Sequence, residues 1–359
     1  MMIYYPNNNL LMNKNNAFDL LRILLAVLVL FSHAYLIGGY GQEPFASIVK
    51  NQTYIAEFGV MGFFSLSGYL IAGSYERSKN IYIFLWHRIV RIFPGFWFCL
   101  IITSFVIAPI IYFSDHHTIS NFPFTGDNSS FSFIYRNLFL EVNQWSIGDI
   151  LNNSAYKLSL NGSLWSLRPE FYCYIFIMLI GLGGIFNDNK LPFFIITGLL
   201  YLVYSLKFVF NINYGPTFLI LSNALKLYTC FVLGSLFYMY RERLQFKAKG
   251  LVVITIITLL LLKYGGYNIM APILISIICI SLFSKFKVKF KYDISYGLYI
   301  YAFPIEQLVY KLWRTYLNIW GYLVIILLIT SVMSFLSFIL IEKPFLRLKN
   351  ILNEYVPRL

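Results

Sequence analysis

Long apolar segments recur along this 359-residue chain and constrain its fold more than any other feature. A helix of about 20 mostly apolar residues crosses a lipid bilayer, and segments of that kind lie near residues 17–38, 55–73, 90–112, 164–185, 191–209, 217–240, 250–265, 269–284, 294–310 and 321–341. Hydrophobic residues make up 59% of the chain and charged residues 12%, which is too apolar for a soluble globular protein. The sequence predicts an all-α, polytopic membrane bundle of about ten transmembrane helices, forming one domain over residues 1–359.

The basic residues are concentrated in alternate connections between these segments. The net charge is +13, and clusters lie at residues 77–91, 241–249, 285–291 and 343–358. Such connections face the cytoplasm, so ten spans place both termini there and make residues 342–359 a short cytoplasmic tail. No soluble domain carries the charge, so we expect membrane lipid as a partner and no nucleic acid. The alternating lysines of 285–291 favour a segment against anionic headgroups over a nucleotide-binding role.

One predicted outer connection, residues 113–163, is far longer than the others. A loop of that length is usually functional or disordered, and its many aromatic residues argue against disorder. We expect it to lie over the outer mouth of the bundle, where aromatics such as Trp145 could bind a sugar. The run Asp115-His116-His117 lacks the spacing of converging metal ligands, and so do the four cysteines. We expect no metal.

An arginine and a histidine lie within the first apolar segment. Arg22 and His33 are eleven residues apart, almost three helical turns, so both lie on one face, roughly 16 Å apart along the axis. Ionisable groups in a bilayer are costly and are functional hypotheses by default. The alternatives are that Arg22 extends to the interface and that His33 makes an ordinary hydrogen bond between helices.

A second basic pair, Arg88 and Arg91, begins the third apolar segment. Their spacing of three residues places both guanidinium groups on one helical face. Planar guanidinium groups can hold phosphate oxygens through paired hydrogen bonds. The alternative is ordinary anchoring at the cytoplasmic surface.

The chain resembles the acyltransferase 3 family of bacterial membrane proteins, which acylate sugars and other extracytoplasmic acceptors. The similarity covers essentially the whole chain and rests on six ordered features: Arg22 with His33, FFSLSGYLI at 63–71, residues 88–94 with Trp97, LWSL at 164–167 followed by Glu170-Phe171-Tyr172, SYGLY at 295–299, and EKPF at 342–345. It implies a multi-pass protein of the bacterial cytoplasmic membrane.

Two departures from the family pattern bear on mechanism. Many relatives carry a histidine before the proline of the ninth span, whereas this chain has Ala302-Phe303-Pro304, so His33 is expected to be the essential imidazole. Some relatives also carry an esterase-like domain after the last span. We expect none here, because the chain ends about fifteen residues beyond that span.

The resemblance implies that an acyl-coenzyme A donor, usually acetyl-coenzyme A, is used from the cytoplasm to acylate a hydroxyl on the other side. Arg88 and Arg91 would hold its phosphates, and Arg22 would meet a phosphate or the thioester. His33 would act as general base on a sugar hydroxyl, which we favour over an acetyl-histidine intermediate. Glu170 would orient His33, stabilise its imidazolium form, bind the acceptor or, if protonated, act as an acid.

Further side chains could line a channel or contact substrate: Trp165, Ser166, Ser295 and Tyr296. Serines at membrane depth are more often packing residues, and none of these lies in a nucleophile-elbow pattern. The expected acceptor is a surface-glycan sugar such as an O-antigen or capsule unit. The alternative function is a transporter or flippase of a glycan or lipid-linked intermediate, which intramembrane charges suit equally well, although no internal repeat supports it.

Overall fold

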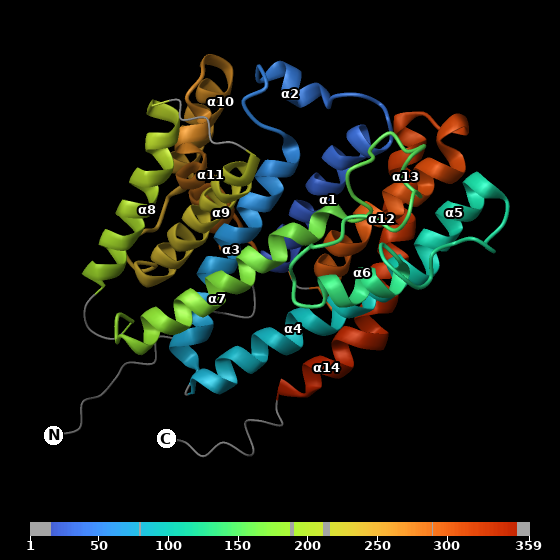
Figure 1. Ribbon diagram of the computed structural model, residues 1–359. Helices are drawn as coiled ribbons and strands as arrows, with labels where there is room; N and C mark the ends of the chain where they lie inside the picture. The colour runs from blue at the N-terminus through green and yellow to red at the C-terminus, as the bar shows by residue number, and fades with distance from the viewer. Residues whose placement is uncertain (1–15, 79, 187–189, 211–215, 289, 350–359) are drawn as a thin grey trace.

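The computed structural model describes residues 16–78, 80–186, 190–210, 216–288 and 290–349, and over these residues it is helical without strands. Figure 1 shows the arrangement of its helices: α1 (Phe18–Ile37), α2 (Pro44–Ile48), α3 (Ile55–Arg77), α4 (Ile81–Ile102), α5 (Ala108–His116), α6 (Ser130–Asn137), α7 (Leu167–Leu182), α8 (Leu191–Val209), α9 (Pro216–Met239), α10 (Ala248–Tyr264), α11 (Tyr267–Phe283), α12 (Ser295–Trp313), α13 (Ile319–Ser337) and α14 (Lys343–Arg347). Short helical turns at Thr103–Ile107, Gly162–Ser166, Arg314–Tyr316 and Phe338–Glu342 join neighbouring helices. The predicted all-α class is confirmed.

Each predicted apolar segment coincides with a helix, and the chain is a membrane protein. In the described residues, five continuous helical stretches are long and apolar enough to cross a membrane: Phe18–Ile37, Ile55–Arg77, Ile81–His116, Leu191–Val209 and Ile319–Arg347. A shorter apolar helix is Tyr267–Phe283. The count of ten spans and the cytoplasmic side of the termini stay predictions.

The third apolar segment is longer than the sequence pattern predicts. Its helix begins at Ile81 rather than near residue 90, because the side chain of Asn80 caps it by accepting the Tyr82 N–H at 2.7 Å. The basic turn that holds Arg88 and Arg91 therefore belongs to the body of α4. This places both guanidinium groups against the neighbouring helices rather than in a surface loop.

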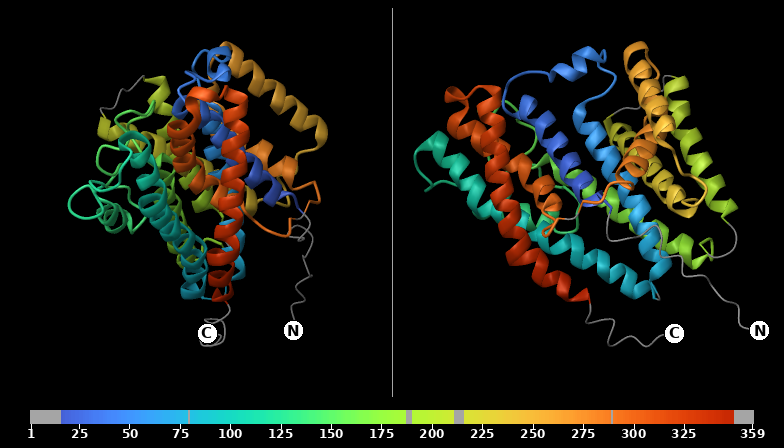
Figure 2. Two further views of the ribbon diagram at one scale, coloured as in Figure 1. Left: turned by 90° about the vertical axis from the view of Figure 1, so that its right-hand side faces the viewer. Right: turned by 180° about the vertical axis from the view of Figure 1, so that it is seen from behind.

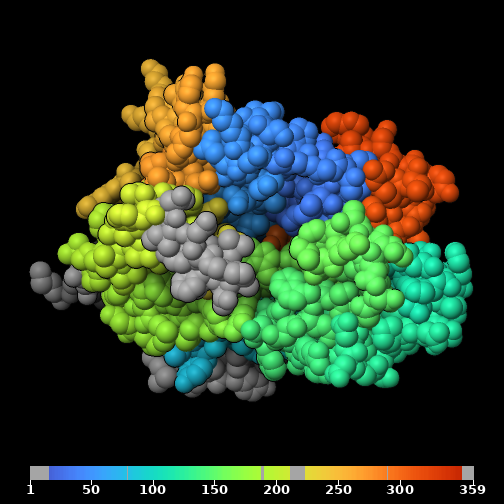
Figure 3. All heavy atoms as spheres, turned by 45° about the horizontal axis from the view of Figure 1, so that its top comes forward, coloured from blue at the N-terminus to red at the C-terminus, as the bar shows by residue number. Residues whose placement is uncertain are grey.

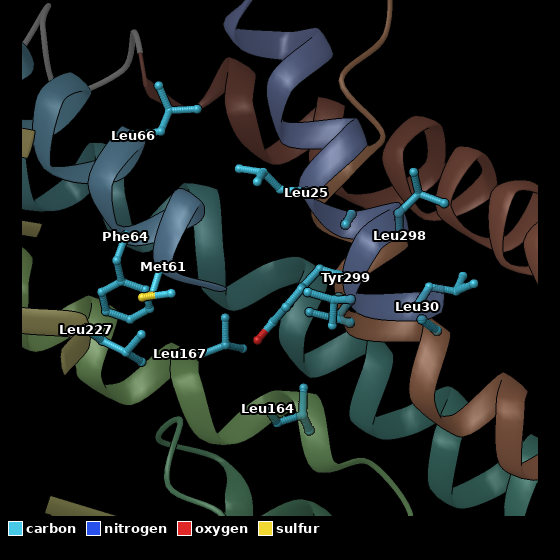
Figure 4. Packing of buried hydrophobic residues seen from close by; sticks show 14 of the residues in the cluster. Leu25, Leu30, Met61, Phe64, Leu66, Leu164, Leu167, Leu227, Leu298 and Tyr299 are labelled. Atoms are coloured by element: carbon cyan, nitrogen blue, oxygen red, sulfur yellow. The ribbon is translucent and has the colours of Figure 1, made fainter. Parts of the chain in front are cut away.

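The bundle is held together by close contact between α3 and its neighbours α1 and α9, seen from two further directions in Figure 2. A Cβ on Gly68 would lie 1.9 Å from the Phe231 carbonyl oxygen, so the α3 and α9 backbones touch there. Leu25 of α1 packs directly on Gly62 of α3. Figure 4 shows Leu25, Met61 and Tyr299 among the side chains of the buried cluster. Small residues at helix contacts are the usual means of close approach in membranes.

The segment between α5 and α7 is folded, as its aromatic content predicts. Phe122, Phe133, Leu140 and Ile150 are buried, and α6 begins with a reciprocal cap between Ser129 and Ser132. Figure 3 shows one face of the molecule, on which the green chain preceding α7 adjoins the blue α1–α3 region. The surface is hollowed where the two regions meet.

Candidate active site

A cavity of about 470 Å³ lies among α1, α3, α4, α7 and α12. Its charged lining consists of five basic and two acidic residues: Arg22, Arg88, Arg91, Lys291, Lys349, Glu170 and Asp293. Ser166, Ser295 and Tyr296 also line it. The structure thus gathers seven of the predicted site residues around one positively charged space.

Asp293 is the carboxylate that organises the cavity wall. One of its oxygens lies 2.7 Å from Arg91 and 3.5 Å from Arg22, while Arg22 also lies 3.3 Å from Asp19. Its other oxygen accepts hydrogen bonds from the N–H and hydroxyl of Ser295 at the start of α12. Burial opposes ionisation of Asp293, yet the two guanidinium groups dominate and lower its pKa to about 2. Asp293 stays charged and fixes two arginines at once.

Arg91 has a second carboxylate partner from the far end of the chain. Its Nη1 lies 3.5 Å from an oxygen of Glu342, which is buried, and its guanidinium carbon lies 5.8 Å from the centre of the Tyr296 ring. The Tyr296 hydroxyl in turn donates to the Ile92 carbonyl at 2.9 Å. With two carboxylates around it, the Arg91 charge is largely balanced within the protein.

Arg88, unlike Arg91, has no carboxylate partner among the described residues. Its Nη2 donates to the Ser74 hydroxyl at 3.2 Å, and its buried Nε has no partner within the protein. Its guanidinium carbon lies 5.7 Å from the Phe84 ring centre and 6.0 Å from that of Tyr174. Among the described residues no carboxylate lies within 4 Å of it. Of the predicted phosphate-binding pair, Arg88 is therefore the member open to an anionic ligand.

Lys349 adds a titratable cation beside Arg88. Burial and the positive charges of Arg88, Arg91 and Arg22 lower the pKa of Lys349 to about 8. Repulsion between an ammonium group and neighbouring cations is relieved when an anion binds among them. Lys349 and Arg88 therefore make one end of the cavity attractive to phosphate.

Glu170 lies in this cavity and is held by two hydroxyl groups. Ser67 of α3 donates to its carboxylate at 3.1 Å, and Tyr174, one turn along α7, donates to the same oxygen. In the described part of the chain, no hydrogen bond or ion pair joins Glu170 to His33. Both hydrogen bonds to the Glu170 carboxylate come from hydroxyls at the cavity, and its role toward His33 stays a prediction.

His33 lies outside the lining of the cavity. Its ring packs edge-on against Phe303, with centres 5.2 Å apart, and its buried Nδ1 has no partner within the protein. Phe303 is the residue that replaces the histidine expected from the family pattern. One turn earlier on α12, the Tyr299 hydroxyl bonds to Ser166 at 2.7 Å and borders the cavity. Figure 4 shows the Tyr299 oxygen directed toward α7, near Leu164 and Leu167.

The two predicted tryptophans lie away from the cavity. Trp165 is partly buried and packs against the hydrophobic core. Trp145 is 41% exposed in the chain between α6 and α7, where its carbonyl accepts the Leu160 N–H at 2.7 Å. Neither residue lines the space that holds Arg88.

Sequence reasoning missed several residues of the site. Asp293 lies two residues before Ser295, where the SYGLY segment begins, and Glu342 is the first residue of the EKPF segment. Their positions at these motifs were the available sequence signal. The tract 285–291 is not wholly a headgroup segment, because Phe290 and Lys291 line the cavity; Lys289 lies outside the described residues. Lys349 lies among other basic residues near the C-terminus, and no sequence motif marks it as a site residue.

Comparison with known proteins now identifies the family. A family model of the acyltransferase domain matches residues 15–342. The chain belongs to the acyltransferase 3 family. An O-acetyl transferase of Shigella phage Sf6 is 31% identical over 350 residues, which are 93% of this chain and 97% of that protein. Nodulation protein 10 of Rhizobium leguminosarum bv. viciae is 38% identical over 90 residues, 25% of this chain and 24% of that protein. No solved structure gives a significant match.

The family match spans the described cavity almost completely. It includes α1 with Arg22 and His33, the α4 arginines and Glu342, and it ends before Lys349. Apart from Lys349, the charged lining of the cavity thus lies within the matched domain.

Proposed function

We propose that this acyltransferase is an O-acetyltransferase of the bacterial cytoplasmic membrane, which transfers acetyl from cytoplasmic acetyl-coenzyme A to a sugar hydroxyl of a surface glycan such as an O-antigen or capsule unit. The observation that carries the proposal is Arg88, whose buried Nε has no protein partner and which lines a cavity rich in cations. The phage relative is described as an O-acetyl transferase, which supports acetyl as the group and oxygen as the acceptor atom.

The phosphates of the donor bind at the Arg88 and Lys349 end of the cavity. Charge-assisted hydrogen bonds from guanidinium to phosphate are among the strongest in proteins. Arg22 and Arg91 are tied to Asp293, so they shape and polarise the wall instead of clamping phosphate. The thioester extends toward Ser166 and Tyr299, which border the other part of the cavity.

The transfer step exchanges one bond for another. The acceptor hydroxyl oxygen attacks the thioester carbonyl carbon, the carbon–sulfur bond breaks, and the thiolate takes a proton as coenzyme A leaves. His33 removes the hydroxyl proton as general base. Tyr299 borders the cavity and lies one helical turn before Phe303, which packs on His33, so α12 connects the donor cavity with the region of His33.

Thiol release from acetyl-coenzyme A by the purified protein tests the reaction. We expect release with wild-type protein and at least a hundredfold loss in His33→Ala, because the essential imidazole is gone. If the protein incubated with labelled acetyl-coenzyme A and no acceptor retains labelled acetyl, His33 forms an acetyl-histidine intermediate and does not act as a general base. A transporter would move a glycan across vesicles without releasing thiol, and that result would overturn the proposal.

The acceptor is identified in cells. Mass spectrometry of surface glycans from cells with and without the active protein should differ by acetyl groups on one sugar position. Cells producing His33→Ala serve as the matched control, because the protein is present but cannot transfer. Identical glycans in all three strains would exclude a surface glycan as acceptor.

A further inference from the structure

A second polar region surrounds Phe303, outside the donor cavity. The Phe303 ring centre lies 5.2 Å from that of His33 and 5.7 Å from that of Tyr156. A Cβ on Gly162 would lie 2.6 Å from the same ring, so the chain entering α7 packs directly on it. Three separate parts of the sequence, α1, residues 156–162 and α12, therefore meet here.

Two amide side chains in this region are fixed with their oxygens unused. Asn161 donates through Nδ2 to the Ile300 carbonyl at 2.9 Å, and Gln307 donates through Nε2 to the carbonyls of Tyr156 and Ser159, both at 2.9 Å. Because carbonyl oxygens only accept, these contacts settle which amide atom is nitrogen. The Asn161 Oδ1 and Gln307 Oε1 atoms are buried and have no partner within the protein.

Glu306 is the most unusual group of the region. Its side chain is fully buried, at 0% exposure, and neither carboxyl oxygen has a partner within the protein. It lies one helical turn beyond Phe303 on α12, next to Gln307. The buried His33 Nδ1 and Ser163 Oγ are likewise unpartnered. Buried polar groups are nearly always paired in proteins, so a group of five exceptions requires an explanation.

The chemistry of these atoms specifies what would satisfy them. The amide oxygens accept hydrogen bonds and cannot donate, and each carboxyl oxygen of Glu306 can accept as well. A partner for them must offer several donors at short spacing, and a carbohydrate with vicinal hydroxyl groups does so. Apolar chains and phosphate groups offer none, which distinguishes this region from the Arg88 end of the donor cavity.

We propose that His33, Asn161, Ser163, Glu306 and Gln307 form the acceptor subsite, in which sugar hydroxyls bind to the unused oxygens and one hydroxyl is held at His33. The inference rests on the proposed function and adds the residues that select the acceptor. In Figure 3 the surface is hollowed between the blue α1–α3 region and the green chain before α7, and a small orange-red patch of chain is visible at the base of the hollow. The ring of Phe303 forms an apolar surface within this subsite, beside His33.

Glu306→Met tests the subsite, because methionine keeps the volume and removes both oxygens. The probe is surface polysaccharide from the producing bacterium, freed of ester acetyl groups by mild alkali, with labelled acetyl-coenzyme A as donor. We expect the KM for polysaccharide to rise at least tenfold, and the KM for acetyl-coenzyme A to stay within twofold of wild type. We also expect an unchanged or higher Tm, since the carboxyl has no protein contact to lose. Glu306→Gln keeps one oxygen, so its KM for polysaccharide should lie between those of the wild type and Glu306→Met.

Thr330→Val is the matched control, because it removes another buried unpartnered oxygen, on α13. It should leave both KM values unchanged. If Glu306→Met lowers the Tm and leaves the polysaccharide KM at the wild-type value, the group is structural and the inference is overturned. Failure of the proposed function looks different: the wild-type protein itself would release no thiol and label no polysaccharide.

Discussion

At the scale of single residues, two arginines one helical turn apart differ in what surrounds them. Arg88 has one protein hydrogen bond, to Ser74, whereas Arg91 lies between Asp293 and Glu342. For Arg88→Gln we expect the KM for acetyl-coenzyme A to rise roughly 10- to 100-fold, because a charge-assisted hydrogen bond contributes about 1.5–3 kcal/mol. Its Tm should change little.

Arg91→Gln should give the opposite result. Removing one partner of a fully buried ion pair costs about 3–5 kcal/mol. Arg91 and Asp293 are about a quarter exposed, so we expect a smaller but clear loss of stability when the carboxylates of Asp293 and Glu342 lose that partner. Thermal unfolding and donor kinetics, measured on both variants in the same detergent, check the contrast. Equal losses of Tm in the two variants would contradict the division of roles.

Lys349 gives the site a pH dependence. Its pKa of about 8 means that raising the pH through 8 removes a positive charge from the donor cavity, so kcat/KM for acetyl-coenzyme A should fall above pH 8. Lys349→Arg stays charged, so its kcat/KM for acetyl-coenzyme A should not fall above pH 8. A decline that persists in Lys349→Arg would assign it to another group.

Unfolding does not account for such a decline. The pKa of Lys349 in the fold is lower than the roughly 10.4 of an unfolded lysine. Between about pH 8 and pH 10 the unfolded chain therefore binds more protons at this residue. By linkage, this group makes the fold more stable as pH rises in that window.

The residues that could be predicted are those whose signal is local. Helical spacing alone brings Arg88 and Arg91 to one face, and both border the cavity. The partners of Arg91 lie 202 and 251 residues away in sequence, and no periodicity relates such positions. Glu170 was predicted as a site residue but its contacts were not, because they depend on where α3 places Ser67.

At the scale of helices, the contact between α3 and α9 depends on glycine. A Cβ on Gly68 or Gly234 would lie 1.9 Å from a backbone oxygen of the other helix, so alanine forces the two backbones apart. For Gly68→Ala and Gly234→Ala we expect destabilisation of about 1–3 kcal/mol or more, seen as a lower Tm and poor yield.

Gly198→Ala is the control for this contact. Gly198 lies within α8 with nothing within 4 Å of a built Cβ, so alanine there should be neutral or stabilise the helix by up to about 1 kcal/mol. A similar loss of Tm in all three variants would show that helix contact is not the cause.

The start of α4 shows why hydropathy misplaces helix ends. His87, Arg88 and Arg91 lower the local hydropathy, so the apolar pattern begins near residue 90, yet Asn80 caps the helix ten residues earlier. A cap acts through one hydrogen bond and leaves no trace in an average over a window. The helices could be predicted, while this boundary, and with it the depth of Arg88, could not.

At the scale of the whole molecule, the structure separates two chemically different regions. Cations gather at the donor cavity, whereas the region around Phe303 offers neutral or acidic oxygens. Tyr299, which lines the donor cavity, lies one helical turn before Phe303 on α12. Such a division suits an enzyme whose two substrates come from opposite sides of a membrane.

The last prediction concerns this arrangement across the bilayer. We reconstitute the protein into sealed vesicles, orient it by a protease-sensitive tag at the C-terminus, and supply acetyl-coenzyme A and de-O-acetylated polysaccharide in the same or in opposite compartments. Label should enter polysaccharide when the donor shares the compartment of the Arg88 end and the acceptor lies in the other. With both substrates in either single compartment, transfer should fall at least tenfold, and permeabilising the vesicles should restore it. Equal transfer with both substrates in one compartment would mean that the donor cavity and the Phe303 region open to the same side, and that the membrane does not separate the two halves of the reaction.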